Sequence, residues 1–403
     1  MEQIQNNRVI TDLYRENAQF PGIALDGSDV YLCWQRFVDR HDSLMASCRR
    51  GDEVVWEREI SDGGEVLHPV ILAHGGAIWY AWSEYARENW RILARCYRDG
   101  QWGEVLTVAS GEALFFPRLF TWQGRLHVIW TEQHKGRAAV LCPLTEAGPG
   151  AAETVSTVGE AYRAGAAEGG DGNLYAAYDG FDGKQYKLFA RARTAAGWSE
   201  EIVVSQGEDW ASTPWIAAKP DGAVVGWYDY GYMAVYSVRS ADLTVRDGAL
   251  AAVNPQCLKE GVDWYLDLHV ASNSSGLQAM AYTRSKYDVL VCTRRGSEPW
   301  SRPVLMSYGD GHCGVHPKLL VDEDDTIHLM WQFGFKNGHM ERNAQVIYNH
   351  LTPAELAQQP DYVAPPSDFT QPIPANADKR LDEHPADVVR AWLDKNGYGN
   401  LSV

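Results

Sequence analysis

Residues able to bind or cleave a sugar are concentrated in short polar segments, each of which follows an apolar stretch that ends in Trp or Tyr. Tyrosines lie beside arginines and carboxylates there, and this mixture suits a sugar. Aromatic faces stack on sugar rings, and an Arg fork binds a carboxylate through two hydrogen bonds. The candidates from these segments are Arg36, Glu84, Tyr85, Glu132, His134, Asp179, Tyr228, Asp229, Tyr232 and Arg284.

Two histidines occupy corresponding places, because His68 precedes Pro69 and His316 precedes Pro317. A histidine titrates near neutral pH, so it is a natural general base or metal ligand. The alternative is a structural histidine that binds a neighbouring loop. We take both histidines as candidate catalytic residues.

A metal site is the second interpretation of the segment around His316. The run His312-Cys313-Gly-Val-His316 is rich in ligand atoms, and His339 lies in the loop that follows. Zinc requires three or four such ligands in a tetrahedral arrangement. The run is shorter than standard zinc motifs, so we expect no required cofactor and keep zinc as the alternative.

The elements that carry these residues repeat along the chain. An apolar strand ends in an aromatic residue at steps of 48 or 49 residues, with one step of 55, at Trp34, Trp82, Trp130, Tyr178, Trp227, Tyr282 and Trp331. A strand-rich repeat of roughly 40–50 residues is typical of a β-propeller blade. The sequence therefore predicts an all-β, seven-bladed β-propeller.

Each repeat predicts a four-stranded antiparallel blade. Turn pairs such as Asp26-Gly27 and Asp171-Gly172 separate the first two strands, and they suit hairpins. The last repeat lacks its own fourth strand, and the isolated segment Arg8–Thr11 is apolar enough to supply it. We therefore expect the N-terminal segment to close the ring of blades.

The repeat also separates scaffold from candidate function. Residues that recur from blade to blade indicate a shared turn feature, as do the four Gly-Glu pairs that begin at Gly64, Gly111, Gly159 and Gly207. Residues that break the pattern are better candidates for function. His68 and His316 belong to blades 2 and 7, which blade 1 alone separates, so the two could share a site. The 55-residue step adds an aromatic and acidic insertion that contains Trp264, a further candidate for substrate contact.

Composition narrows the class of protein. The net charge of −17 argues against nucleic acid as a partner. No apolar run of about 18 residues exists, so no membrane span is expected.

The seven cysteines fall mostly in equivalent strands of different blades, too far apart to pair, and indicate buried thiols in a reducing compartment. The N-terminus does not resemble a secretory signal. We expect a cytoplasmic protein, with secretion left open for a chain whose leader was removed.

The C-terminal region departs from the repeat. We assign residues 1–362 to the propeller and residues 363–403 to a Pro-rich linker and a short helix. Proline near the helix start and Asn-Gly at its end are typical helix boundaries. We expect this helix to pack on the propeller, with an oligomer contact as the alternative. The chain is then a monomer or a small homo-oligomer.

The turns before the fourth strands carry a family resemblance. Asp99-Gly100-Gln101-Trp102 and Ala196-Gly197-Trp198 resemble degenerate Asp-box (BNR) repeats of the sialidase-like propellers. The Phe/Tyr-Arg-Ile-Pro motif of sialidases is replaced here by Gln19-Phe20-Pro21-Gly22, which has no arginine. The whole-chain pattern is similar to seven-bladed carbohydrate-active propellers, such as ulvan-type polysaccharide lyases and related rhamnosidases.

This resemblance implies roles for residue types. In the lyases His and Tyr serve as base and acid, while Arg neutralises the uronate carboxylate. The corresponding types in this chain are His68, His316, Tyr85, Tyr228, Arg163 and Arg284. The resemblance thus implies a lyase that cleaves uronate-containing oligosaccharides or polysaccharides by β-elimination.

Two other functions remain open. An exo-glycosidase of sialidase or rhamnosidase type would use paired carboxylates among Glu84, Glu132, Asp179 and Asp229. A non-catalytic propeller would bind a glycan without turnover, because a fold alone does not establish catalysis.

Overall fold

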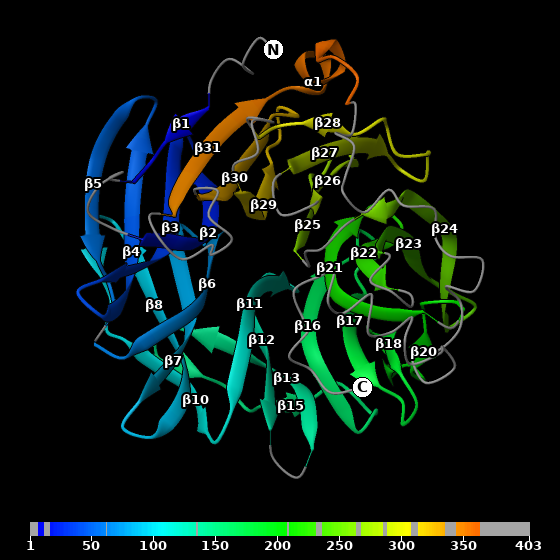
Figure 1. Cartoon of the computed structure of the whole chain (residues 1–403). Helices are drawn as coiled ribbons and strands as arrows, with labels where there is room; N and C mark the ends of the chain where they lie inside the picture. The colour runs from blue at the N-terminus through cyan, green and yellow to red at the C-terminus, as the bar shows by residue number, and fades with distance from the viewer. Residues whose placement is uncertain are drawn as a thin grey trace, which may run out of the picture.

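The computed structural model describes residues 7–11, 17–61, 63–133, 136–207, 209–230, 236–262, 267–284, 288–307, 313–334 and 344–362. This part of the chain is an all-β propeller built of antiparallel strands, with one small helix (Figure 1). No helix within it is long and apolar enough to cross a membrane.

Five sheets form separate blades around the centre of the molecule. The first contains β2(Asn17–Asp26), β3(Asp29–Val38), β4(His41–Arg50) and β5(Glu53–Glu59), and the second contains β6(Glu65–His74), β7(Ala77–Ala86), β8(Asn89–Arg98), the short β9(Gln101–Trp102) and β10(Leu106–Gly111). The next two, further along the chain, contain β21(Trp210–Lys219), β22(Gly222–Tyr230), β23(Tyr236–Arg246) and β24(Ala249–Val262), and then β25(Leu268–Ser272), β26(Leu277–Arg284), β27(Asp288–Arg295) and β28(Val304–Leu305). The last contains β29(Cys313–Val321), β30(Ile327–Gly334), β31(Gln345–Leu351) and the N-terminal β1(Arg8–Val9).

The remaining sheet has ten strands. It contains β11(Leu114–Trp122), β12(Arg125–Gln133), β13(Arg137–Thr145), β14(Gly148–Pro149), β15(Glu153–Thr154), β16(Glu160–Glu168), β17(Leu174–Phe181), β18(Tyr186–Thr194), β19(Gly197–Trp198) and β20(Ile202–Val203). Its two halves are joined by one parallel pair, Arg137 with Glu160. The sheets thus give five separate blades where the repeat predicts seven, because this pair merges the strands of the third and fourth repeats.

The N-terminal segment closes the ring, as the sequence predicts. Arg8 and Val9 of β1 pair with β31 in antiparallel fashion, and the Ile10 amide donates to the Val346 carbonyl at 2.8 Å. The Thr11 hydroxyl donates to the Gln345 side chain at 2.7 Å. The first and last strands of the described chain, β1 and β31, therefore share one blade.

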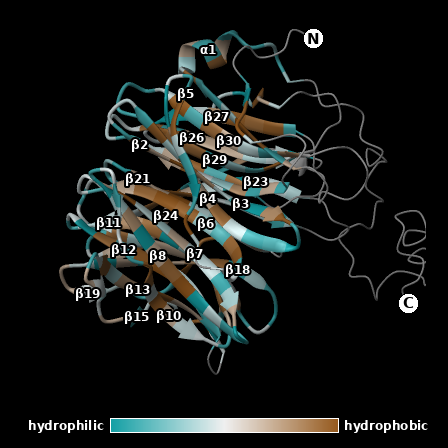
Figure 2. Ribbon diagram, turned by 90° about the vertical axis from the view of Figure 1, so that its left-hand side faces the viewer, coloured by the Kyte–Doolittle hydropathy of each residue, from teal (hydrophilic) through white to brown (hydrophobic). Residues whose placement is uncertain are grey.

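The repeated aromatic residues form the core between blades. All are buried, including Trp34, Trp82 and Trp331 with no exposed surface. Burial of such large side chains is a main source of stability. Apolar residues (brown) lie along the strands and polar ones (teal) at the turns (Figure 2). Five described cysteines are free thiols and buried, as the sequence predicts: Cys33, Cys48, Cys96, Cys142 and Cys292.

A helix that the repeat does not predict follows the last blade. α1(Pro353–Gln358) begins after Thr352, whose hydroxyl caps the Glu355 amide, while the Glu355 carboxylate accepts from the Thr352 amide. This capping box, with proline at the first position, is a local helix start signal. The linker and helix expected over 363–403 lie outside the described residues.

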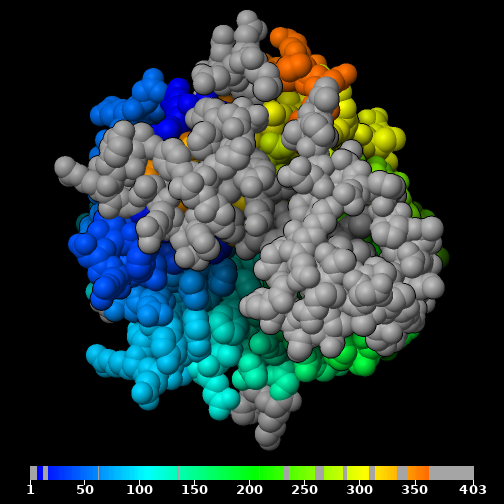
Figure 3. Space-filling view, in the orientation of Figure 1, coloured from blue at the N-terminus to red at the C-terminus, as the bar shows by residue number. Residues whose placement is uncertain are grey.

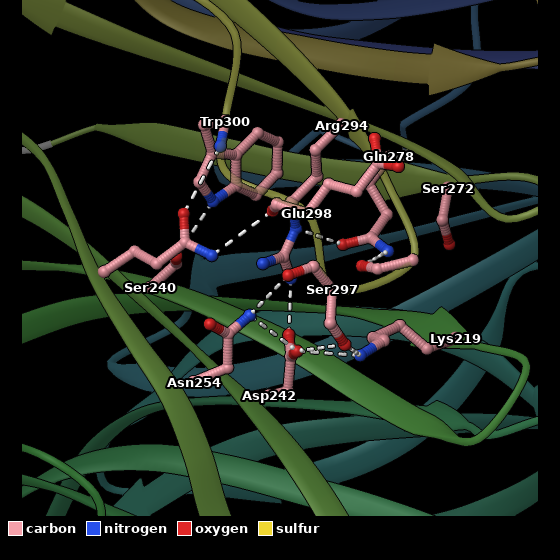
Figure 4. A network of polar contacts seen from close by, with 12 residues as sticks. Lys219, Ser240, Asp242, Asn254, Ser272, Gln278, Arg294, Ser297, Glu298 and Trp300 are labelled. Carbon is pink, nitrogen blue, oxygen red and sulfur yellow. Dashed lines mark hydrogen bonds and ion pairs between the residues drawn. The ribbon is translucent and has the colours of Figure 1, made fainter.

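A buried network of polar residues joins two neighbouring blades (Figure 4). Asp242 of β23 forms ion pairs with Lys219 of β21 at 2.8 Å and with Arg294 of β27. It also accepts from Asn254 at 3.1 Å and from Ser297 at 2.9 Å. Asp242 and Arg294 have fully buried side chains. We call Lys219, Asp242 and Arg294 with their partners the interblade network.

Candidate functional site

The innermost strands share a backbone feature that directs side chains out of the regular strand pattern. Their pairing registers shift at the residue before the proline, and Phe20, His68, Phe116, Thr213 and His316 all have φ between 49° and 56°. Such bulges re-aim a side chain, and positive φ is strained for residues other than glycine. The same bulge in five of the repeats therefore presents one side chain from each of them.

The repeats that lack this proline contribute equivalent residues. Arg163 precedes Ala164, which pairs with Tyr178, and Asp267 precedes Leu268, which pairs with Tyr282. Adding these two to the five residues above defines the axial ring: Phe20, His68, Phe116, Arg163, Thr213, Asp267 and His316.

Contacts confirm that the axial ring is one cluster. Ring centroids of Phe20 lie 4.5 Å from His316 and 5.4 Å from His68. His68 lies 4.3 Å from Phe116, whose ring has the Arg163 guanidinium 5.5 Å from its centroid. His68 and His316, expected to share a site, thus contact the two sides of one phenylalanine.

His316 and Asp267 form the titratable pair of the ring. The Nδ1 atom of His316 lies 2.6 Å from Oδ2 of Asp267, and their side chains are 14% and 15% exposed. Burial opposes ionisation of Asp267, but the charges of Lys318 and His316 hold the pKa of that carboxyl below its usual range. An ionised Asp267 accepts a hydrogen bond from Nδ1–H, and in a neutral imidazole of this tautomer the lone pair is on Nε2.

His68 has a different character. Burial lowers the pKa of His68 to about 3, and repulsion from His316 and Arg163 acts in the same direction. Its Nδ1 atom is buried without a hydrogen-bond partner among the described residues. At neutral pH this histidine is uncharged, so it acts as a hydrogen-bonding group and not as a cation.

Arg163 is held on one side only. Its Nη1 atom donates to Asp179 at 3.1 Å and to the Thr213 hydroxyl at 3.1 Å. Asp179 also accepts from the amides of Arg163 at 2.7 Å and Thr213 at 3.2 Å. The Arg163 side chain is 29% exposed, so a fixed guanidinium remains accessible beside the histidines.

A second layer of residues lies on the same strands, two positions after the residues of the axial ring. The Trp215 ring has the Arg118 guanidinium 3.7 Å from its centroid, the Lys318 ammonium at 4.5 Å and the His269 ring at 4.0 Å. Arg118 reaches Trp215 across Gly165, where an added Cβ would lie 2.7 Å from the guanidinium. Lys318 also lies 3.7 Å from Asp267, so this layer adds positive charge beside the ring.

Tyr228, a predicted proton donor, lies in the wall behind the ring. Its side chain is 1% exposed. The hydroxyl donates to the carbonyls of Asp267 at 3.2 Å and Thr283 at 3.1 Å, and accepts from the Thr283 amide. Burial raises the pKa of Tyr228. Its contacts fit a residue that positions the Asp267 backbone.

Three of the predicted sugar-binding carboxylates share a structural role. Each accepts the indole N–H of the tryptophan two residues before it: Glu84 from Trp82 at 3.3 Å, Glu132 from Trp130 at 3.2 Å and Asp229 from Trp227 at 2.6 Å. Because a recurrent partner holds them, they belong to the repeated scaffold. Asp179, which follows a tyrosine, is the one of the four that reaches the ring.

The other predicted residues lie apart or are undescribed. Tyr85 packs on Trp90 at the blade rim, Arg36 pairs with Glu59 at 2.7 Å, and Arg284 donates to Tyr362 at 3.0 Å. His134, Tyr232, Trp264, His312 and His339 lie outside the described residues, as does the Cys313 side chain. Within the described part, no three metal-ligating side chains form a cluster.

Asp267, Arg118, His269 and Lys318 were missed by the sequence reasoning. The sequence does contain a signal for them. Asp267 aligns with the residues that precede the blade prolines, and the other three align with the residues that follow these prolines. Arg118 and Lys318 directly follow the blade prolines, where polar residues interrupt apolar strands. Asp267 and His269 lack that marker, since Leu268 replaces the proline between them.

Comparison with known proteins gives a likeness in fold. No family model matches the chain, and no curated protein matches its sequence. An ulvan lyase, solved bound to a GlcA(1-4)Rha3S saccharide, superposes with a TM-score of 0.58 at 10% identity over 88% of this chain and 100% of that one. The polysaccharide lyase Uly1 gives 0.56 at 10% identity over 85% of this chain and 91% of that one.

A sialidase is less similar in structure. The sialidase of Trypanosoma rangeli in complex with sialic acid gives a TM-score of 0.49 at 7% identity, over 88% of this chain and 60% of that one. The two lyases span nearly the whole of the described chain. The protein thus shares the β-propeller fold of these polysaccharide lyases.

Proposed function

We propose that the protein is a glycan-cleaving enzyme, a lyase that acts by β-elimination on uronate-containing oligosaccharides or polysaccharides. The observation that carries this proposal is the convergence of the His316–Asp267 pair, His68 and Arg163 in one accessible ring. The likeness in fold to polysaccharide lyases supports it by analogy.

The proposal includes a seven-bladed architecture. The ten-stranded sheet would be counted as two blades, β11–β15 and β16–β20. The support is that, among the described strands, the pair of Arg137 with Glu160 is the one pairing that joins the two halves, while each half has its own antiparallel strands. Each blade then contributes one residue to the axial ring.

The chemistry follows from the charges of the ring. Nε2 of His316 takes the proton next to the uronate carboxylate, while Asp267 stabilises the imidazolium that forms. Arg163, with Lys318 nearby, stabilises the negative charge that develops on the carboxylate. The bond to the leaving oxygen then breaks, a carbon–carbon double bond forms, and the imidazolium returns its proton to that oxygen. These cations supply the positive charge, so the scheme requires no metal ion.

The experiment measures the unsaturated uronate product by its ultraviolet absorbance. We expect His316→Ala to lower kcat by about 100- to 10,000-fold, the usual contribution of a general base. We expect Asp267→Asn to lower kcat by about 10- to 100-fold, as for other partners that orient a histidine.

The chain offers a matched control in the same blade. His328 lies 3.2 Å from Asp322 through its Nε2 atom, away from the ring. Asp322→Asn removes the same kind of carboxylate from the same kind of pair and is expected to keep kcat within about twofold. Equal effects of Asp267→Asn and Asp322→Asn would contradict the proposed site. The absence of product with every uronate glycan tested would contradict the proposed reaction.

A further inference from the structure

A hollow separate from the axial ring lies at the rim between the first two blades. Its volume is about 570 Å³, and no residue of the axial ring lines it. Its lining includes Arg40, His41, Tyr85, Arg87 and Arg91, together with the loop Gly63–Glu65. The blades that carry it are coloured blue to cyan and remain visible on the face shown in Figure 3.

Two tight hairpins carry the arginines of this hollow. The turn between β3 and β4 consists of Asp39 and Arg40, with φ of 52° and 65°. The turn between β7 and β8 consists of Arg87 and Glu88, with φ of 52° and 61°. Two-residue turns of this kind favour Asn-Gly, and each other residue at positive φ is strained. The arginines are therefore held on short, rigid hairpins.

The charges of the hollow favour an anion. Glu84 is fully buried beneath it and pairs with Arg91, and Gly64 makes room for this carboxylate, since an added Cβ would lie 2.4 Å from Glu84 Cγ. Arg40 and Arg87 are exposed, and neither forms an ion pair with an acid in the described part of the chain. The lining also includes two acids, Asp42, which accepts from Gln35 at 2.8 Å, and the exposed Glu65. Because neither acid forms an ion pair with Arg40 or Arg87, these two arginines are available to bind an anion.

A continuous row of aromatic rings connects the hollow with the axial ring. Tyr85, 36% exposed, packs on Trp90 at 5.2 Å, and Trp90 contacts Phe115 edge-to-face at 4.7 Å. Phe115 lies 6.2 Å from Phe116, which contacts His68 at 4.3 Å. The row is half-buried along its length. Such rings offer successive faces on which sugars stack.

We propose that this hollow is a distal subsite that binds an anionic sugar of the same glycan chain whose cleaved bond lies at the axial ring. The inference rests on the proposed function and extends it to a substrate of several sugar units. Tyr85 stacks on the sugar ring, and Arg40 and Arg87 bind its carboxylate or sulfate group. A short saccharide would occupy the axial ring alone.

The test measures binding without turnover. Full-length His316→Ala protein is titrated calorimetrically with oligosaccharides of equal length that carry uronate groups, sulfate groups or no charge. We expect Arg87→Ala in this background to weaken binding of an anionic oligosaccharide roughly tenfold, the loss of one charge-assisted hydrogen bond. We expect Tyr85→Ala to weaken all three ligands about fivefold. Of the uronate and sulfate oligosaccharides, the one whose affinity falls more on Arg87→Ala carries the group that this arginine binds.

Arg246 provides the matched control. It is an exposed arginine beside the turn between β23 and β24, on the opposite face from the β7–β8 hairpin. Arg246→Ala removes the same charge and is expected to leave every affinity unchanged. Equal affinities of the Arg87→Ala and Arg246→Ala proteins for the charged oligosaccharides would overturn the subsite.

A second readout separates this inference from the proposed reaction. With active protein, Arg87→Ala should raise KM for a long uronate oligosaccharide and leave kcat and KM for a disaccharide unchanged. An equal rise in KM for both lengths would place Arg87 in the central site and contradict a distal one. Normal binding without any unsaturated product would instead contradict β-elimination and leave the subsite standing.

Discussion

The axial ring and the interblade network are both clusters of charged residues between blades, yet they differ in exposure. In the network, Asp242 is fully buried and binds two cations and two neutral donors (Figure 4). In the ring, Asp267, His316 and Arg163 are partly exposed. Each cluster has one buried nitrogen without a partner among the described residues, Nδ1 of His68 in the ring and Nη1 of Arg294 in the network.

The difference shows how charge serves two purposes in one fold. A sealed cluster holds two blades in place, because loss of a charged member leaves its buried partner without full compensation. A half-open cluster retains groups that a ligand can satisfy. Exposure therefore points to the ring as the site, although the Asp242 carboxylate of the network binds more partners.

The largest effect is expected in the network. Asp242→Ala should lower the free energy of unfolding by about 3–5 kcal/mol, because Lys219 and Arg294 would remain buried without their carboxylate. Chemical denaturation measures this loss. Asp221, an exposed partner of Lys219 at 3.5 Å, gives the control. Asp221→Ala should change stability by less than about 0.5 kcal/mol, and a similar loss for both variants would show that burial does not separate them.

A smaller effect is expected at the closure of the ring of blades. Deletion of residues 1–16 removes the strand pairing of β1 and the hydrogen bonds of Ile10 and Thr11 with the last blade. We expect a stability loss of about 2–3 kcal/mol, at roughly 1 kcal/mol for each such bond. Because Phe20 and His316 belong to the two blades so joined, catalytic activity should fall with the melting temperature. An unchanged melting temperature would refute this closure.

The smallest effect at neutral pH is expected for His68→Phe, which places in the ring the residue found at Phe20 and Phe116. His68 is uncharged in the folded protein down to about pH 3, whereas a histidine in the unfolded chain binds a proton near its usual pKa of about 6.5. The unfolded state therefore binds more protons between these values, and stability falls as the pH decreases through this window. His68→Phe removes this titrating group, so unfolding of the variant should take up one proton fewer between these pH values.

Denaturation curves measured from pH 7 to pH 3 test this prediction. His328 is a matched control, because burial lowers its pKa whereas Asp322 opposes the shift. A variant at His328 should therefore change the pH dependence less. An identical pH dependence for wild type and His68→Phe would mean that His68 is charged in the folded protein.

The repeated features of the chain were predictable because each follows from a local pattern. The aromatic residue at the strand end is buried in every repeat, and the isolated apolar segment at Arg8 completes the last blade. The histidines were found as departures from the repeat. The blade count was not recovered from the sheets, since the Arg137–Glu160 pair merges two repeats into one sheet.

The partners of individual side chains were not predictable. Glu84, Glu132 and Asp229 lie in the polar segments that suit a sugar, but indole N–H groups bind them. Tyr228 lies in such a segment too, yet its hydroxyl is bound to the backbone. Conversely, Asp267 has no proline beside it and still pairs with His316.

By itself, the sequence determined the propeller architecture, its closure and the corresponding positions of His68 and His316 before blade prolines. These depend on periodic burial and turn chemistry, which act between residues close in the chain. Only the tertiary structure decided which polar groups meet, because His316 and Asp267, or Arg163 and Thr213, come from different blades. Their distances and pKa values depend on blades packed around a common axis, and no spacing within one repeat encodes that arrangement.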